Sequence, residues 1–171
     1  MAAGATYEPL ATTTLGSNQS SVTFSSIPGT YTDLVLVVNA GSTSTDNFAY
    51  LEFNTDTSGN NYSWTTLYGN GSSAGSARNN SIGYICAYVG IGTSLDTTII
   101  TNIQNYSNSS TYKTWLSRSN RVSTGGTYYG TEALVGNWHN ASAITSVKVN
   151  AYSTFSFITG STFTLFGIAA A

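Results

Sequence analysis

The sequence predicts an all-β protein built as an antiparallel β-sandwich or a closed barrel. Short runs rich in Val, Ile, Thr and Tyr alternate with clusters of Gly, Ser, Asn and Thr, and no segment shows a helical period of convincing length. Strands of this length at even spacing are typical of sandwiches and barrels rather than of α/β folds.

Eleven strands are predicted, each bounded by a turn cluster such as "GSNQ", "IPGT", "SNSS" or "STGG". In chain order they are Ala5–Leu15, Ser21–Ser25, Asp33–Asn39, Phe48–Phe53, Tyr62–Tyr68, Ile82–Val89, Thr97–Tyr106, Tyr112–Ser119, Thr127–Asn137, Ile144–Ala151 and Ser161–Ile168. The long cluster "GNGSSAGSARNN" is interpreted as a turn.

Alternation within the strands predicts which side chains face the core. Val147, Val149 and Ala151 are expected to point inward, and so are Phe163 and Leu165. The run Leu34–Val38 is apolar on both faces, which predicts a central strand covered on one side by a second sheet and on the other by a neighbouring subunit.

The composition indicates one domain with a polar surface that is poor in charge. The 171 residues suffice for one core, and we expect an N-terminal arm over residues 1–5 followed by a single domain over residues 6–171. Only 7% of the residues are charged, whereas 13% are aromatic, a proportion that argues against disorder.

Several classes of partner are disfavoured. Five basic residues at a net charge of −2 cannot form a phosphate-binding stripe, so we expect no nucleic acid. The longest apolar run, Leu34–Val38, is too short to span a membrane. The first ten residues lack the basic and apolar regions of a signal peptide, which predicts synthesis in the cytoplasm without export.

The stretch "LEFNTDTSGNNYSW" resembles a calcium loop at its start, where Asn54, Asp56 and Ser58 alternate before Gly59. The twelfth position, which requires a bidentate Glu, is Thr65. We therefore interpret this stretch as a hairpin loop and predict no bound metal there.

No other pattern predicts a catalytic or cofactor site. His139 is the only histidine, and Cys86, the only cysteine, lies among apolar residues and is expected to fill core volume. A Ser-His-Asp triad would lack a nucleophile elbow. A carboxylate pair for glycoside hydrolysis would have to come from the seven acids, of which Asp46, Glu52 and Asp56 are closest in sequence. We predict a protein that is not an enzyme and has no cofactor.

Aromatic residues leave carbohydrate binding open. Trp64, Trp115 and Trp138, together with Tyr68, Tyr128 and Tyr129, are candidate stacking faces for sugar rings. Alternation favours the core for Trp64 and Trp115 and leaves Trp138 undecided. The alternative glycan-facing group is therefore Trp138, His139 and Asn140.

Several stretches together resemble a family of small virion proteins of tailed bacteriophages. They are "SSIPGTYTDLVL", "LEFNTDTSGNNYSW", "YGNGSS", "GNWHNASAITSVKV" and "STFTLFGI", which match most of the chain from Ser21 onward in the family's order. Phe166 and Val147 stand where Tyr and Ile are common in the family. The resemblance implies a jelly-roll-like antiparallel β-sandwich.

The same resemblance implies one of two roles on the virion. The first, which we favour because the chain shows one compact domain and no fibrous shaft, is a capsid decoration or cement protein. It would bind the phage major capsid protein on the outer capsid surface as a homotrimer, with the arm Met1, Ala2, Ala3, Gly4 and Ala5 as the expected capsid contact. The alternative is a fibre or tail tip module that binds a host receptor or a host-surface glycan.

Overall fold

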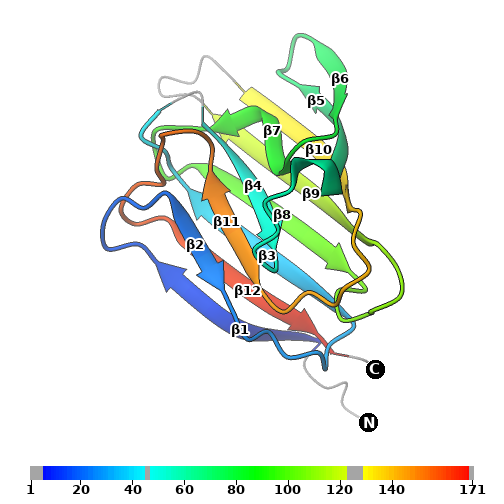
Figure 1. Cartoon of the computed structure of the whole chain (residues 1–171). Helices are drawn as coiled ribbons and strands as arrows, with labels where there is room; N and C mark the ends of the chain where they lie inside the picture. The colour runs from blue at the N-terminus through cyan, green and yellow to red at the C-terminus, as the bar shows by residue number, and fades with distance from the viewer. Residues whose placement is uncertain (1–5, 45–46, 123–128, 170–171) are drawn as a thin grey trace.

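Two antiparallel sheets face each other in the computed structural model, which describes residues 6–44, 47–122 and 129–169 (Figure 1). The large sheet has the order β1-β12-β3-β8-β9-β10-β5-β6 and the small sheet the order β2-β11-β4-β7. The large-sheet strands are β1 (Tyr7–Thr14), β12 (Thr162–Ile168), β3 (Asp33–Ala40), β8 (Thr97–Gln104), β9 (Lys113–Val122), β10 (Tyr129–Trp138), β5 (Tyr62–Gly69) and β6 (Ala74–Asn79). The small-sheet strands are β2 (Ser21–Phe24), β11 (Val147–Ala151), β4 (Asn47–Phe53) and β7 (Gly83–Ile91).

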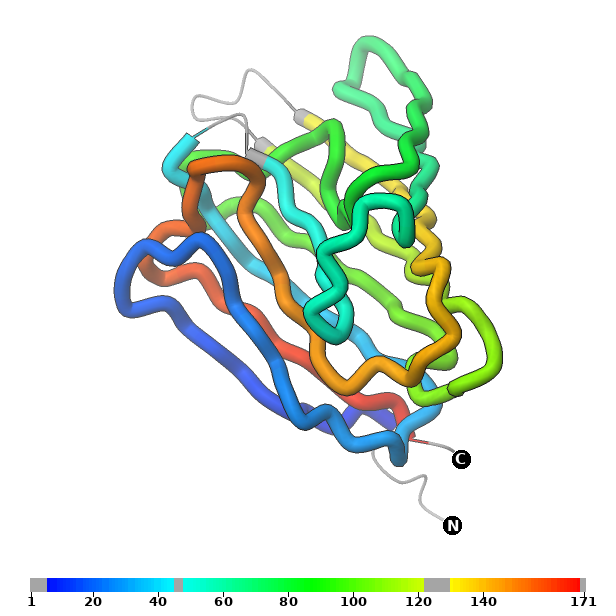
Figure 2. Tube along the Cα trace, in the orientation of Figure 1, coloured from blue at the N-terminus to red at the C-terminus, as the bar shows by residue number. Residues whose placement is uncertain are grey.

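The pairing of the strands is that of a jelly roll. From the ends of the chain inward, β1 pairs with β12, β2 with β11, β3 with β8 and β4 with β7, all antiparallel. These four pairs alternate between the two sheets. The chain therefore forms one long antiparallel ribbon that wraps around the core (Figure 2). The predicted all-β, jelly-roll-like sandwich is confirmed.

Two inserted strand pairs enlarge one sheet only. The pair β5 and β6 lies between β4 and β7 in the chain, and β9 and β10 lie between β8 and β11. All four strands join the large sheet beyond β8, so that sheet extends past the small one. In Figure 1 the β5–β6 hairpin projects from the body as the outermost part of this extension.

The core lies between the sheets and follows the predicted alternation. Val147, Val149, Phe163 and Leu165 are all buried, as expected. Cys86 is fully buried, and burial raises the pKa of its thiol well above the ordinary value. This position suits a small apolar side chain and leaves the thiol without the activation that a nucleophile needs.

Besides shifts at other strand ends, such as that of β9, which runs to Val122 rather than Ser119, the structure differs from the predicted strands in three places. β6 was predicted as part of a turn because "AGSARN" is small, polar and mostly exposed; it is an edge strand that pairs only with β5. β11 begins at Val147 rather than Ile144. The stretch 54–61, predicted as a hairpin loop, instead connects β4 of the small sheet to β5 of the large sheet and contains the 3-10 turn Gly59–Asn61.

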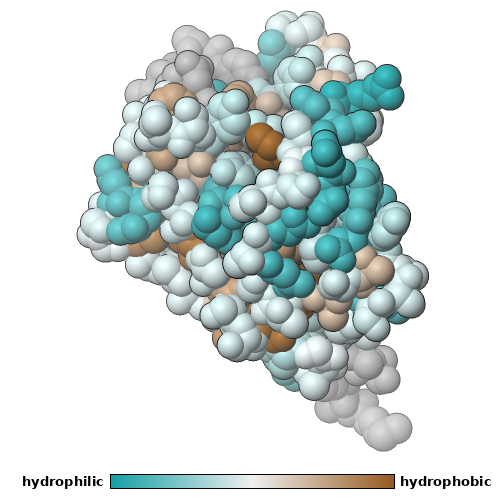
Figure 3. Space-filling view, viewed as in Figure 1, coloured by the Kyte–Doolittle hydropathy of each residue, from teal (hydrophilic) through white to brown (hydrophobic). Residues whose placement is uncertain are grey.

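The exposed surface reflects the low charge of the chain. Figure 3 shows the side of the molecule that carries the small sheet, where most atoms are white or pale teal and only small areas are brown. None of the described residues forms a helix that is long and apolar enough to span a membrane.

Candidate functional site

Trp138 is a core residue, which corrects its assignment to a glycan-facing group. Its side chain is 1% exposed, and the centroid of its ring lies 5.5 Å from that of Phe53. The indole Nε1 donates a hydrogen bond of 2.8 Å to Asp56 Oδ2. Because neither ring face is open to solvent, Trp138 cannot stack on a sugar.

His139 and Asn140 therefore do not share a platform with Trp138. His139 is exposed, and its Nε2 lies 3.1 Å from Ser63 Oγ. Its ring is 6.0 Å from that of Tyr112, which is 61% exposed. Asn140 turns its side chain back on its own loop, where Oδ1 accepts a hydrogen bond from the backbone N–H of Ser142.

The stretch that resembles a calcium loop is filled by the protein's own donors. The carboxylate of Asp56 accepts hydrogen bonds from Asn61 Nδ2, Trp138 Nε1 and the backbone N–H of Ser58. Partial burial would raise the pKa of Asp56, but these hydrogen bonds outweigh it and lower the pKa below the usual value. These donors occupy the carboxylate and would repel a cation beside it.

Asn54 joins the same loop to the segment before β11. Its Oδ1 accepts hydrogen bonds from the backbone N–H groups of Thr145 and Ser146, and its Nδ2 donates to the carbonyl oxygen of Ala143. Two of the motifs that carry the phage resemblance, "LEFNTDTSGNNYSW" and "GNWHNASAITSVKV", are thus joined by hydrogen bonds of Asn54 and Asp56. Their role in this fold is to hold two loops together.

Most of the described acids have structural partners, and Glu52 and Asp56 line one small hollow together with Tyr50 and Tyr62. Glu52 forms a 3.1 Å ion pair with Lys148, and Glu8 accepts a 2.8 Å hydrogen bond from the hydroxyl of Tyr31. Asp33 accepts a hydrogen bond from the backbone N–H of Asn105. Asp46 lies outside the described residues. Within residues 6–44, 47–122 and 129–169, no three His, Cys, Asp or Glu side chains gather as a metal site would require.

Glu132 is a buried acid, since its side chain is 4% exposed between the sheets. Its carboxylate accepts hydrogen bonds of 3.1 Å from the backbone N–H groups of Ala87, Tyr88 and Val89. Thr66 donates a further one of 2.8 Å. Glu132 therefore pins a segment of β7 to the extended part of the large sheet.

The segment that Glu132 holds is a bulge in β7. Between the pairs Ala49–Cys86 and Asn47–Ile91, four residues of β7 face a single residue of β4. Gly90 takes a φ of +73° there, which a side chain would disfavour. The bulge turns Tyr88 outward, and its ring is 45% exposed.

Further side chains of the extension fasten the other part of β7. Trp115 Nε1 donates a 3.0 Å hydrogen bond to the carbonyl of Tyr84, and Ser117 Oγ donates one of 2.6 Å to that of Ile85. Thus two carbonyl groups of β7 are bonded by side chains of the large sheet. These two groups are not available for pairing with another strand.

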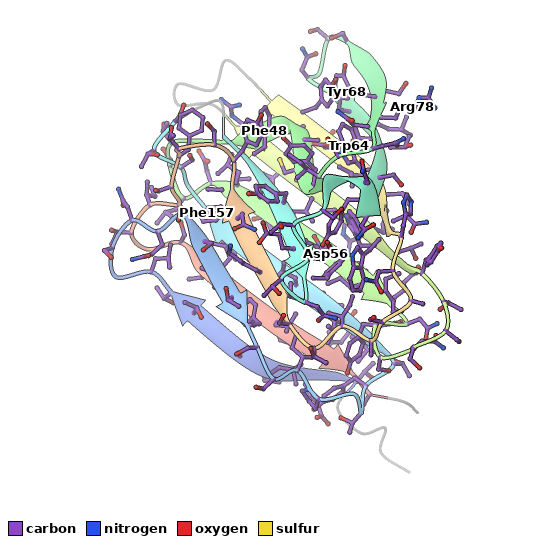
Figure 4. All side chains as sticks on the ribbon, in the orientation of Figure 1. Phe48, Asp56, Trp64, Tyr68, Arg78 and Phe157 are labelled. Carbon is purple, nitrogen blue, oxygen red and sulfur yellow. The ribbon has the colours of Figure 1, made fainter. Side chains whose placement is uncertain are left out.

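A cluster of tyrosines and one tryptophan lies where the projecting β5–β6 hairpin meets the edge of β7. The rings of Tyr68 and Tyr88 stack in parallel, with centroids 4.3 Å apart and an interplanar angle of 10°. Trp64 contacts Tyr88 and Tyr84 edge-on, at 6.5 and 5.6 Å. Figure 4 shows Trp64 and Tyr68 one beyond the other along β5, on the side of β7. We call Trp64, Tyr68, Tyr84 and Tyr88 the aromatic step.

The outer face of the large sheet carries the exposed aliphatic side chains. Leu67, Leu116 and Val135 are 65%, 45% and 54% exposed, and Val135 lies directly opposite Leu116 in the β9–β10 register. Two cross-strand rows that contain these residues run across all eight strands and include only two charged side chains. The rows are Arg78, Thr65, Val135, Leu116, Asn102, Val35, Phe166, Pro9 and Ser76, Leu67, Ala133, Arg118, Ile100, Val37, Thr164, Thr12. We call this surface the large-sheet face.

The solvent side of an antiparallel sheet is normally polar, so large exposed aliphatics in adjacent positions indicate a contact surface. Val35 is 4% exposed although it lies on this face, beside Phe166. A shallow hollow of about 490 Å³ lies next to Leu67 and Ala133, so the surface is not flat there. The arm 1–5, the predicted capsid contact, lies outside the described residues.

Sequence reasoning missed Glu132 and the outward position of Tyr88. Glu132 was detectable in part, because it alternates with Leu134, Gly136 and Trp138 on one face of β10. No local pattern marks the bulge that exposes Tyr88.

Comparison with known proteins adds no family. No protein-family model matches the sequence, and no curated protein matches it. Among solved structures, a Bacteroides vulgatus protein described as a candidate pore-forming toxin is 8% identical, aligned over 79% of this chain and 53% of its own, with a TM-score of 0.10. The chain spans about half the length of that protein. A TM-score this low carries no argument about fold or function.

Proposed function

We propose that the protein is a bacteriophage virion structural protein, a capsid decoration protein that binds the outer capsid surface as a homotrimer and stabilises the head. The observation that supports it most directly is the large-sheet face, where exposed aliphatics lie on a broad, charge-poor sheet. A surface of this kind contributes contact area and offers no reactive group.

The large-sheet face would close the trimer. Leu116 and Val135 lie side by side on the inserted strands β9 and β10, away from the jelly-roll core, so they can be covered without deforming it. A standard interface buries about 800 Å² on each partner. The sheet extension built by the inserted strands supplies flat area of the kind that such an interface needs.

Attachment to the head would then stabilise it by mass action. A protein that binds only the assembled lattice lowers the free energy of that lattice relative to free capsid subunits. Three linked copies convert modest single contacts into tight attachment, since the second and third contacts form at high effective concentration. Because only 7% of the residues are charged, such contacts would depend less on salt than ionic contacts do.

The oligomer is tested by native mass spectrometry and light scattering of the wild type and of the double variant Leu116→Lys, Val135→Lys. We expect a trimer for the wild type and a monomer for the variant. The two lysines of each copy would be buried in the interface without acidic partners, and their charges would repel one another. Leu95→Lys is the matched control, since Leu95 is 51% exposed in the loop after β7. A wild type that is monomeric at micromolar concentration would contradict the trimer.

Labelling of virions tests the location. Many copies distributed over the head would support decoration, whereas a few copies at the vertex or the tail would favour the fibre or tail module. Isolated heads that resist heat no better with the protein than without it would contradict the stabilising role.

A further inference from the structure

We propose that the aromatic step is a binding site for neutral sugars, with Tyr88 as the ring on which a saccharide stacks. This inference is independent of the capsid role. It rests on the structure of β5, β6 and β7. Trp64 and Tyr68 were among the candidate stacking residues named from the sequence, whereas Tyr88 was not.

The ring of Tyr88 has one supported face and a large exposed fraction. On its supported side, Tyr68 stacks on it at 4.3 Å. Tyr68 in turn lies against the backbone of β6, where a Cβ built on Gly75 would come within 2.8 Å of the Tyr68 ring. Gly75, Tyr68 and Tyr88 thus form layers, and at 45% exposure Tyr88 is the outermost of them.

The backbone beneath Tyr88 is also held in place. The bulge that carries it is fastened by the carboxylate of Glu132, which accepts hydrogen bonds from three consecutive N–H groups including that of Tyr88 itself. Burying a carboxylate costs free energy, and here the carboxylate is used to fix the backbone of an exposed tyrosine. Rigid aromatic rings lose little entropy on binding, so fixing one in advance favours a ligand that stacks.

The chemistry of the step fits a neutral sugar better than a protein. Its three tyrosines carry hydroxyl groups, whereas the indole of Trp64 is buried beneath them. The aromatic contacts continue over the small sheet through Phe48, Tyr50 and Tyr152, whose rings are 6.0 to 6.2 Å from that of Tyr84. The exposed aliphatics that suit a protein contact gather instead on the large-sheet face. The charged pair nearby on the small sheet, Glu52 and Lys148, is internally neutralised.

The test is isothermal titration calorimetry of the whole chain with maltohexaose, cellohexaose and chitohexaose, at up to about 10 mM sugar. We expect the wild type to bind at least one of them. Tyr88→Ala should weaken that binding by about tenfold or more, as truncation of an aromatic anchor does. Tyr88→Phe, which keeps the ring, should bind within about threefold of the wild type.

Gly75→Ala tests whether Tyr68 must support Tyr88, because the added Cβ would displace the Tyr68 ring. We expect this variant to bind sugar more weakly, although residue 75 does not contact the sugar. Tyr112→Ala is the matched control: Tyr112 is 61% exposed and lies beside His139, so it also tests the alternative location. Circular dichroism of each variant verifies the fold. The proposal is overturned if the wild type binds none of the three sugars, if Tyr88→Ala binds as tightly as the wild type, or if Tyr112→Ala removes binding. It is also overturned if Tyr88→Ala abolishes attachment to heads while sugar binding is unchanged, since the step would then be a protein contact.

Discussion

Glu132 offers the sharpest test of how this fold is held together. Replacing it by Ala would leave the N–H groups of Ala87, Tyr88 and Val89 without their acceptor. An unsatisfied buried donor costs about 1–3 kcal/mol. At the low end of that range for each donor, because water can reach the more exposed part of the bulge, we expect Glu132→Ala to lower the free energy of unfolding by about 3 kcal/mol.

Urea denaturation followed by tryptophan fluorescence measures this loss, with the slope m unchanged if the native state stays compact. In thermal unfolding the same loss corresponds to a fall in Tm of about 6–12 °C for a chain of this length. Glu132→Gln keeps the volume and one acceptor oxygen, so its loss should fall between that of Glu132→Ala and zero.

Glu8→Ala is the matched control. Glu8 also accepts a hydrogen bond, from Tyr31, but it is exposed on β1. Its removal should change stability by less than about 0.5 kcal/mol. If Glu132→Ala cost no more than Glu8→Ala, the carboxylate would not hold the bulge, and the account of the aromatic step would lose its basis.

The remaining predictions concern the core and the hydrogen bond between Trp138 and Asp56. Gly136→Ala should destabilise severely or prevent folding, because its Cβ would lie 2.0 Å from the Trp115 ring, whereas Gly16→Ala meets no atom within 4 Å and should be nearly neutral by thermal unfolding. The pKa of Asp56 is lowered in the folded state, so its contribution to stability is present above the ordinary carboxyl pKa and is lost as pH falls through the folded value. Asp56→Asn should therefore show a shallower loss of stability between about pH 5 and pH 2 in urea titrations than the wild type, and an identical pH profile would contradict this. Trp138→Phe removes the donor to that carboxylate and should cost about 1–2 kcal/mol at pH 7, a difference that shrinks in acid; equal losses at pH 7 and pH 2 would show that ring packing, not the hydrogen bond, is what the substitution removes.

Much of the fold could be predicted because strand signals are local. The period-two alternation that places Phe163 and Leu165 inside is written in consecutive residues of β12, and every predicted strand exists. β6 was missed because an exposed edge strand of small polar residues is locally indistinguishable from a turn. The hairpin predicted for residues 54–61 was wrong because a loop's sequence does not tell which sheet receives the next strand.

The binding surfaces were less accessible to prediction for a related reason. Trp138 looked undecided at a strand end, yet Asp56, 82 residues away in the chain, supplies the acceptor that lets its indole be buried. Exposure of Leu116 and Val135 depends on which face of β9 and β10 the small sheet covers. The arm 1–5, the homotrimer and the capsid contact stay predictions.

Composition and alternation by themselves determined that this chain forms a charge-poor, all-β sandwich, because burying one face of each strand is decided by neighbouring residues. Only the tertiary structure decided that Glu132 enters the core, that Tyr88 leaves it, and that the aliphatics of the inserted strands remain uncovered. Each of these outcomes depends on pairing between segments that are distant in the chain, since the same side chain is buried or exposed according to what packs across from it.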